Sequence, residues 1–135
     1  MRTLRLDVGE ISLREPGMVN AKVFPNATIN LQHAQDFFHT IEMLTRKGVH
    51  ASVIDITGLA GLDKNAREYM VKTCNEWGTT AGVALVSNSI VSRIIGNLFL
   101  TVSRPNYPIK IFKEHQEAYV WAKHLYLQRA SNIEA

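Results

Sequence analysis

The segment 52–77, SVIDITGLAGLDKNAREYMVKTCNEW, constrains the fold more than any other stretch of the chain. It begins with a short β-branched apolar run, continues through two glycines and ends in a pattern with the helical period. An apolar strand without polar alternation is typical of a sheet that is covered on both faces. The inward face of the expected helix comprises Ala66, Tyr69, Met70, Thr73 and Trp77. The segment therefore predicts a strand–turn–helix unit of an α/β protein.

The chain before this segment predicts an antiparallel hairpin followed by a helix. Apolar and polar residues alternate over 4–23, and Pro16-Gly17 gives a turn signal inside this region. A helix is expected over about 31–47, between Asn30 as its cap and Gly48 as its stop. Its expected inward residues are Leu31, Ala34, Phe38, Ile41 and either Leu44 or Thr45.

The chain after the segment continues the alternation of strands and helices. The expected elements are a strand at 81–86, a helix with the stripe Val91, Ile94, Ile95, Leu98 and Val102, a strand at 109–112 and a helix over about 114–127. The tail 129–135 is expected to be frayed. This order predicts one α/β domain over 1–135, with a mixed, mostly parallel sheet, an N-terminal antiparallel hairpin and four helices. It leaves open whether the helices cover one face or both.

Composition excludes several classes of protein. The chain has 135 residues, 46% of them apolar, and a net charge of +3, which fits a single globular domain and gives no basic stripe for nucleic acid. The single cysteine, Cys74, is expected to be a small buried apolar residue in a reducing compartment. The N-terminus lacks the apolar core of a signal peptide, and no run approaches the roughly 20 apolar residues of a membrane span. We therefore expect a soluble, cytoplasmic protein.

Several motifs resemble one known family. VIDITGL, AREYM, ALVSNSIVSRIIGNLFL, PIKIF and EAYVWAKHL together resemble the STAS domain, the fold of bacterial anti-sigma factor antagonists. The pattern is most similar to small bacterial STAS-like proteins of uncharacterised function. The resemblance covers nearly the whole chain and is strongest over 53–125. It implies a STAS-like fold and a non-enzymatic regulatory or protein-binding role.

The segment that opens the second helix departs from the family pattern. Asp55 and Asp63 match the strand and turn aspartates of the antagonists, which present a phosphorylatable serine at the start of the following helix. Here Lys64, Asn65 and Ala66 follow, and none of them carries a hydroxyl group. The phosphoserine switch is therefore not expected in this chain.

The turns that follow two of the expected parallel strands form the first candidate binding surface. Ligands of open α/β sheets usually bind at the carboxyl ends of the strands, where helix N-termini also favour anions. The candidate residues on this edge are Thr57, Asp63, Asn65, Arg67, Ser87, Ser89 and Arg93. Asp63 and Ser89 equally fit the simpler role of helix caps. Asp55 is predicted to be structural, its carboxylate holding the backbone of the turn, although it could also orient a ligand.

The third helix carries more apolar residues than one buried stripe requires. We expect part of Ile95, Phe99 and Leu100 to contact another molecule, most simply a second copy of the chain in a homodimer. The alternative is burial in the core. Basic residues around this region also suit a lipid surface or an acidic partner: Arg93, Arg104, Lys110, Lys113, Lys123 and Arg129.

Enzyme and metal chemistry have little support in the sequence. The five histidines show no spacing typical of a metal site or a catalytic triad, and no nucleophile elbow or glycine-rich phosphate loop surrounds the serines. We expect no cofactor and no metal. A hydrolase is therefore the weakest hypothesis.

Two functions remain. The first is a non-enzymatic STAS-like module that binds a protein partner through the two turns and the third helix. The alternative is a small hydrophobic-ligand or lipid-surface binding protein, whose ligand would enter near 95–107. A deep apolar pocket would favour the alternative.

Overall fold

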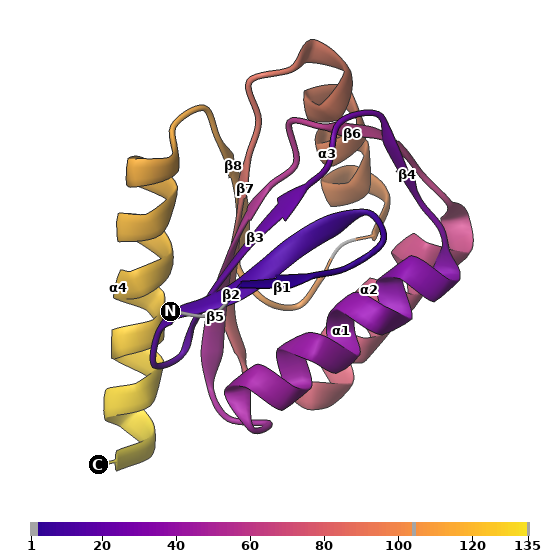
Figure 1. Ribbon diagram of the computed structural model, residues 1–135. Helices are drawn as coiled ribbons and strands as arrows, with labels where there is room; N and C mark the ends of the chain where they lie inside the picture. Colours follow the sequence, from indigo (N-terminus) through magenta and orange to yellow (C-terminus); the bar gives the residue numbers. More distant parts are fainter. Residues whose placement is uncertain (1–2, 104, 135) are drawn as a thin grey trace.

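The computed structural model describes residues 3–103 and 105–134, without the side chains of residues 102, 103, 133 and 134. Twelve elements follow one another along the chain (Figure 1). They are β1 (Thr3–Arg5), β2 (Gly9–Glu15), β3 (Met18–Val23), β4 (Ala27–Ile29), α1 (Leu31–Thr45), β5 (His50–Asp55), β6 (Leu59–Leu62), α2 (Lys64–Trp77), β7 (Thr80–Val86), α3 (Ile90–Ser103), β8 (Ile109–Phe112) and α4 (His115–Glu134).

The main sheet has six strands in the order β1-β2-β3-β5-β7-β8. β1, β2 and β3 pair antiparallel, whereas β3–β5, β5–β7 and β7–β8 are parallel. Gly17 closes the β2–β3 turn at φ 78°, a backbone angle that residues other than glycine rarely adopt. The mixed sheet with an N-terminal antiparallel hairpin and four helices confirms the predicted fold class.

The helices cover both faces of the sheet, which the sequence had left open. Figure 1 shows α4 alone on one side, and α1, α2 and α3 on the other. β7 lies between β5 and the edge strand β8 and is buried along its whole length, in agreement with its continuous apolar sequence. Side chains of β5 therefore alternate between the two faces, with Val53 towards α4 and Ile54 towards the helices of the other side.

A second, two-stranded sheet was not predicted from the sequence. β4 pairs in parallel with β6. β6 lies inside the segment that was expected to be a glycine turn. Gly58 makes the close approach of this ribbon possible, because a Cβ there would lie 2.5 Å from the Phe24 carbonyl oxygen. The ribbon ends directly before α1 and α2, so that both helices start side by side.

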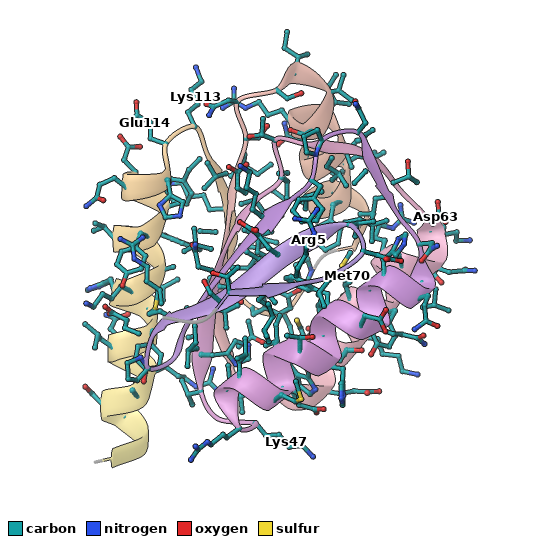
Figure 2. All side chains as sticks on the ribbon, in the orientation of Figure 1. Arg5, Lys47, Asp63, Met70, Lys113 and Glu114 are labelled. Carbon is teal, nitrogen blue, oxygen red and sulfur yellow. The ribbon has the colours of Figure 1, made fainter. Side chains whose placement is uncertain are left out.

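Two helix ends differ from expectation. α1 ends at Thr45, because Arg46 and Lys47 already adopt left-handed backbone angles, so Gly48 is not its stop. The exposed Leu31 at its start is also not an inward residue. α4 continues to Glu134, so residues 129–134 are helical and the predicted frayed tail is wrong there; residue 135 lies outside the described residues. Lys47, in the tight turn after α1, and Lys113 and Glu114, before α4, are exposed (Figure 2).

Capping residues define the start of α1 and both ends of α2. Asn30 caps α1 as predicted, since its Oδ1 accepts from the His33 backbone N–H at 2.9 Å. Asp63 occupies the cap position of α2, but its carboxylate makes no capping hydrogen bond, and it projects into solvent (Figure 2). The expected capping bond of Asp63 is therefore wrong. Gly78 ends α2 at φ 64°.

Candidate functional site

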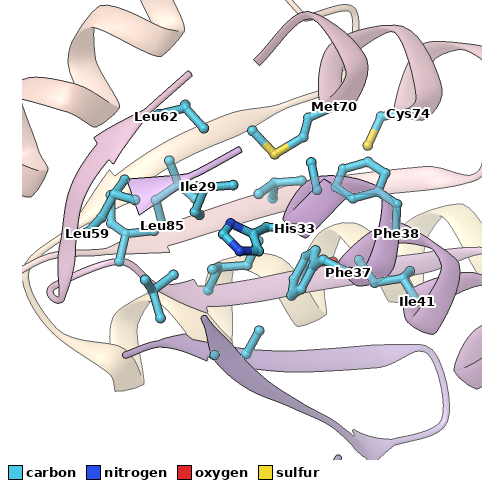
Figure 3. A pocket seen from close by; sticks show the side chains of 18 of the residues that line it. Ile29, His33, Phe37, Phe38, Ile41, Leu59, Leu62, Met70, Cys74 and Leu85 are labelled. Atoms are coloured by element: carbon cyan, nitrogen blue, oxygen red, sulfur yellow. The ribbon is translucent and has the colours of Figure 1, made fainter. Parts of the chain in front are cut away.

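A partly open apolar cavity of about 130 Å³ lies between the sheet and α1, α2 and α3. Figure 3 shows large apolar side chains from α1, from α2 and from both sheets converging on the cavity. These side chains include Ile29, Phe37, Phe38, Ile41, Leu59, Leu62, Met70 and Leu85. Its position follows from the sequence, because the face of the sheet opposite α4 presents branched aliphatic residues that three short helices cover without filling the space completely.

α3 presents its two faces differently from the prediction. Phe99, only 9% exposed, and the half-buried Ile95 face inward and line the cavity. The predicted exposure of Phe99 at an interface is therefore wrong. The large apolar residues exposed on α3 are Ile90, Val91, Ile94 and Leu98, of which the last three were expected in its buried stripe. Leu100 is half-buried, and the side chain of Val102 lies outside the described residues.

The inward face of α3 follows its small residues. Ser92 is fully buried, and a Cβ on Gly96 would lie 3.0 Å from Ile111 Cδ1 and 3.3 Å from Ile56 Cδ1. Small residues let the helix approach the sheet closely, so the larger Ile94 and Leu98 turn outward. A serine and a glycine in an otherwise apolar helix were the signal that could have identified this face.

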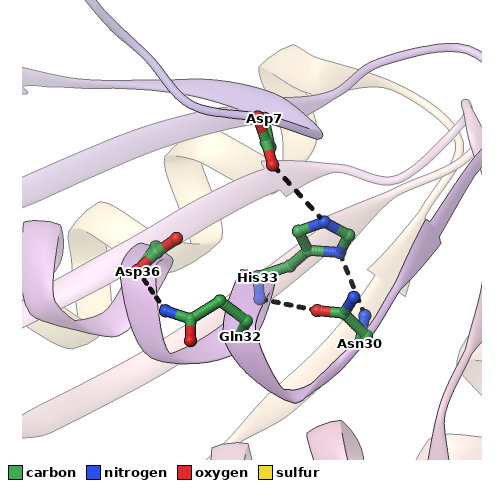
Figure 4. A network of polar contacts seen from close by, with 5 residues as sticks. All are labelled: Asp7, Asn30, Gln32, His33 and Asp36. Atoms are coloured by element: carbon green, nitrogen blue, oxygen red, sulfur yellow. Dashed lines mark hydrogen bonds and ion pairs between the residues drawn. The ribbon is translucent and has the colours of Figure 1, made fainter.

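Charged side chains mark the mouth of the cavity. Asp7, Lys22 and Asp36 contribute to its lining and are exposed to solvent. His33 joins this rim to the start of α1, as Figure 4 shows. Its Nδ1 accepts from the Asn30 backbone N–H at 3.1 Å, so its proton lies on Nε2, which is 3.8 Å from Asp7 Oδ2.

Polar side chains gather at the opposite end of the cavity. His50 and Thr80 begin the neighbouring strands β5 and β7, and both are buried. His50 Nδ1 lies 3.1 Å from the Gly48 carbonyl oxygen, and burial lowers the pKa of His50, so the ring is neutral with its proton on Nδ1. Burial also raises the pKa of Cys74 and the pKa of Tyr107. The predicted burial of Cys74 is confirmed.

The edge formed by the carboxyl ends of the strands is tied together by hydrogen bonds. Asp55 Oδ1 accepts from the Thr57 backbone N–H at 2.9 Å, and Thr57 Oγ1 accepts from the Asn88 backbone N–H at 3.1 Å. Ser87 is buried, and its hydroxyl donates to the Ser89 carbonyl oxygen at 3.0 Å. The structure thus brings the two predicted turns together, with their hydroxyl groups engaged in holding the backbone.

The predicted edge residues do not converge on the cavity. Thr57, Asp63, Asn65, Arg67, Ser87, Ser89, Arg93 and Leu100 are not part of its lining, whereas Ile95 and Phe99 are. Asn65 is exposed, and Arg67 and Arg93 are half-buried on different helices. Binding at the edge therefore stays a prediction, as does the structural role of Asp55.

The side chains that the structure describes form neither a metal site nor a serine–histidine pair. Within residues 3–103 and 105–134, no group of three or more His, Cys, Asp or Glu side chains could hold a metal ion. Over the same ranges, no hydrogen bond joins a serine hydroxyl to a histidine ring. No helix in the described part of the chain is long and apolar enough to cross a membrane.

Comparison with known proteins places the chain in a family. A family model described as a domain of unknown function, DUF7793, matches residues 11–126. The chain belongs to the DUF7793 family. No curated protein matches the sequence.

A solved structure establishes the fold of this DUF7793 chain. It is similar to an uncharacterized protein of the DUF3478 family from Shewanella loihica, which has a SpoIIAA-like fold. The two chains share 17% sequence identity with a TM-score of 0.62, over 90% of this chain and 99% of the other. The DUF7793 chain therefore has a STAS-like, SpoIIAA-like α/β fold, which confirms the resemblance drawn from its motifs.

Proposed function

We propose that the DUF7793 chain is a non-enzymatic STAS-like binding module that holds a small apolar molecule in the cavity between its sheet and α1–α3. The cavity itself carries this proposal. Sites for small molecules are concave, mostly apolar and furnished with a few placed polar groups, and this cavity has all three properties. The observation thus favours the ligand-binding alternative over the protein-binding hypothesis as the principal function.

The size of the cavity limits the ligand. An engineered apolar cavity of about 150 Å³ binds benzene. The cavity of about 130 Å³ is slightly smaller but partly open, so it accommodates a molecule about the size of benzene or toluene without rearrangement. A complete membrane lipid would require α3 or the rim to move outward.

Two measurements test this function. Native mass spectrometry of the protein purified from its own source should show a small bound molecule. In vitro, toluene should shift the amide NMR signals of cavity residues such as Phe38 and Ile41. Ala34→Leu places additional volume in the cavity wall and should abolish the shifts while the protein stays folded. Val120→Leu, on the exposed side of α4, is the control and should leave toluene binding unchanged. Saturable shifts that persist in Ala34→Leu would place the ligand elsewhere.

The outer face of α3 supports a second function, docking to a protein. Ile90, Val91, Ile94 and Leu98 form one exposed stripe, and Ile90 is 80% exposed. Contiguous exposed apolar residues usually mark a contact surface. A second copy of this chain is the simplest partner, because one patch presented twice closes about a two-fold axis.

Sedimentation tests this second function directly. Ile94→Glu places a charge in the stripe and should shift a dimer to monomer without loss of folding. Val120→Glu introduces the same charge at an exposed apolar position of α4 and should change nothing. A protein that is monomeric at every concentration before substitution would exclude the homodimer.

A further inference from the structure

The inner end of the cavity defines the ligand further, if the proposed function holds. We propose that the ligand is uncharged and carries one hydroxyl or carbonyl group, which hydrogen-bonds to the buried polar cluster formed by His50, Ser52 and Thr80. The cluster lies on the sheet, at the amino ends of β5 and β7. The apolar part of the ligand extends from there towards the mouth.

The three side chains lie on one face of the sheet and share one wall of the cavity. His50 pairs with Thr80 in the register of β5 and β7, and Ser52 follows His50 on the same face of β5. All three are at most 4% exposed. Such deeply buried polar groups need partners.

The hydrogen bonds of this cluster leave capacity for a ligand. Since His50 Nδ1 carries the proton towards Gly48, its Nε2 is an acceptor. The neighbouring Thr80 Oγ1 is 3.5 Å from that nitrogen, longer than a well-formed hydrogen bond. The Ser52 hydroxyl has no hydrogen-bond partner within the described ranges. A ligand hydroxyl could therefore donate to His50 Nε2 while its oxygen accepts from Ser52 or Thr80.

The distribution of charge excludes an anionic ligand in this position. The charged residues of the lining, Asp7, Lys22 and Asp36, are exposed and belong to the mouth. Lys22 pairs with Asp55 at the far end of β5 from His50, about 16 Å away along five residues of strand. A carboxylate beside His50 would lose its hydration, and Lys22, the lysine that lines the cavity, lies at the other end of it. A neutral oxygen that accepts from Ser52 or Thr80, as a hydroxyl or a carbonyl does, fits instead.

Three probes of nearly the same shape test the inference by NMR titration of the full chain. Toluene tests whether the cavity binds an apolar molecule, p-cresol adds one hydroxyl, and p-toluate adds an anion. An apolar cavity without polar partners rejects a phenol, because its hydroxyl is desolvated without compensation. We expect p-cresol to bind at least as tightly as toluene and p-toluate to bind at least tenfold more weakly than both.

A pair of double variants locates the recognition. Ser52→Ala/Thr80→Val removes the two hydroxyl groups of the cluster and should weaken p-cresol about tenfold while leaving toluene unchanged. Ser12→Ala/Thr40→Val removes two equally buried hydroxyls that do not line the cavity, and should change neither affinity. If the cluster variant does not fold, the probe series on the unmodified protein decides alone.

The outcomes separate this inference from the proposed function. Toluene binding with at least tenfold weaker p-cresol binding would overturn the inference and leave the apolar ligand in place. Binding of p-toluate as tight as that of p-cresol would overturn the requirement for a neutral ligand. Absence of binding by all three probes would overturn both.

Discussion

The two faces of the sheet differ in how completely they are filled. On the α4 face, Ala118 and Ala122 are fully buried against β5 and β7, and a Cβ on Gly82 would lie 2.6 Å from Leu125 Cδ1. Small residues here bring the helix close to the strands. On the opposite face, α1, α2 and α3 meet larger side chains and leave a cavity of about 130 Å³.

This difference suggests a division of roles within one fold. A single long helix with small contact residues can follow the sheet closely, and such packing stabilises the folded state. Three shorter helices cannot all do so, and the unfilled volume loses contacts that would otherwise stabilise the protein. We infer that the α4 face contributes mainly stability and that the cavity face gives up some stability for binding.

The largest effect is expected for Phe99→Glu. The substitution removes a buried aromatic ring, which alone costs about 3–5 kcal/mol, and it buries a carboxylate among apolar residues. The protein should unfold, as judged by circular dichroism. Ile94→Glu on the outer face of the same helix should change the free energy of unfolding by less than about 0.5 kcal/mol. A folded Phe99→Glu protein would show that the cavity face tolerates far more disorder than we infer.

A matched pair of alanine substitutions compares the two faces directly. Ala122 in α4 and Ala34 in α1 are both at most 1% exposed and face the sheet from opposite sides. Ala122→Leu should lower the free energy of unfolding by about 1–3 kcal/mol, the usual cost of overpacking. Ala34→Leu enters the cavity wall and should cost less than about 1 kcal/mol. Urea denaturation measures both, and equal losses would contradict the proposed difference in packing.

Asp55→Ala tests the edge of the sheet that is formed by the carboxyl ends of the strands and borders both faces. Loss of the bond from Asp55 Oδ1 to the Thr57 N–H should lower the free energy of unfolding by about 1 kcal/mol. Toluene affinity should not change, since Asp55 does not line the cavity. A variant that melts like the unsubstituted protein but loses a partner would instead make Asp55 a binding residue.

The smallest effect concerns pH and the cavity face. Burial lowers the pKa of His50, so below about pH 6.5, the pKa of an unperturbed histidine, the unfolded chain binds a proton that the folded chain does not. The free energy of unfolding should therefore fall as the pH decreases from 7.5 to 5. His50→Gln should reduce this slope, whereas His39→Gln, at an exposed position of α1, should leave it unchanged. Equal slopes in all three proteins would remove His50 as its origin.

Periodicity predicted most of the fold because the relevant patterns are local. Each of these patterns lies within one continuous segment and can be recognised there without knowledge of the rest of the chain. They are the alternation over 4–23, the apolar strands and the stripes of α1, α2 and α4. The missed ribbon of β4 and β6 depends on contact between segments some thirty residues apart, and its strands are too short to show a period. The end of α1 was missed because Arg46 adopts an angle that more often belongs to glycine.

The candidate site was less predictable, for a related reason. α3 is apolar on nearly every side, so hydropathy alone could not assign its inward face, and Phe99 was expected outside rather than inside. The cavity arises because the side chains of the sheet and of α1, α2 and α3 do not fill the space between them, and no single segment encodes this. Its polar end was invisible because His50, Ser52 and Thr80 are ordinary residues at the starts of strands.

The unfilled volume also affects how the protein responds to compression. A void of about 130 Å³ corresponds to about 80 mL per mole, within the range of volume changes on which hydrostatic pressure acts during unfolding. Moderate pressure should therefore drive water between α1, α2 and α3 first and shift the NMR signals of Phe38 and Ile41. The contact of Ala118 and Ala122 with the sheet should yield only later. A bound ligand, by occupying the void, should make both sides of the sheet almost equally incompressible.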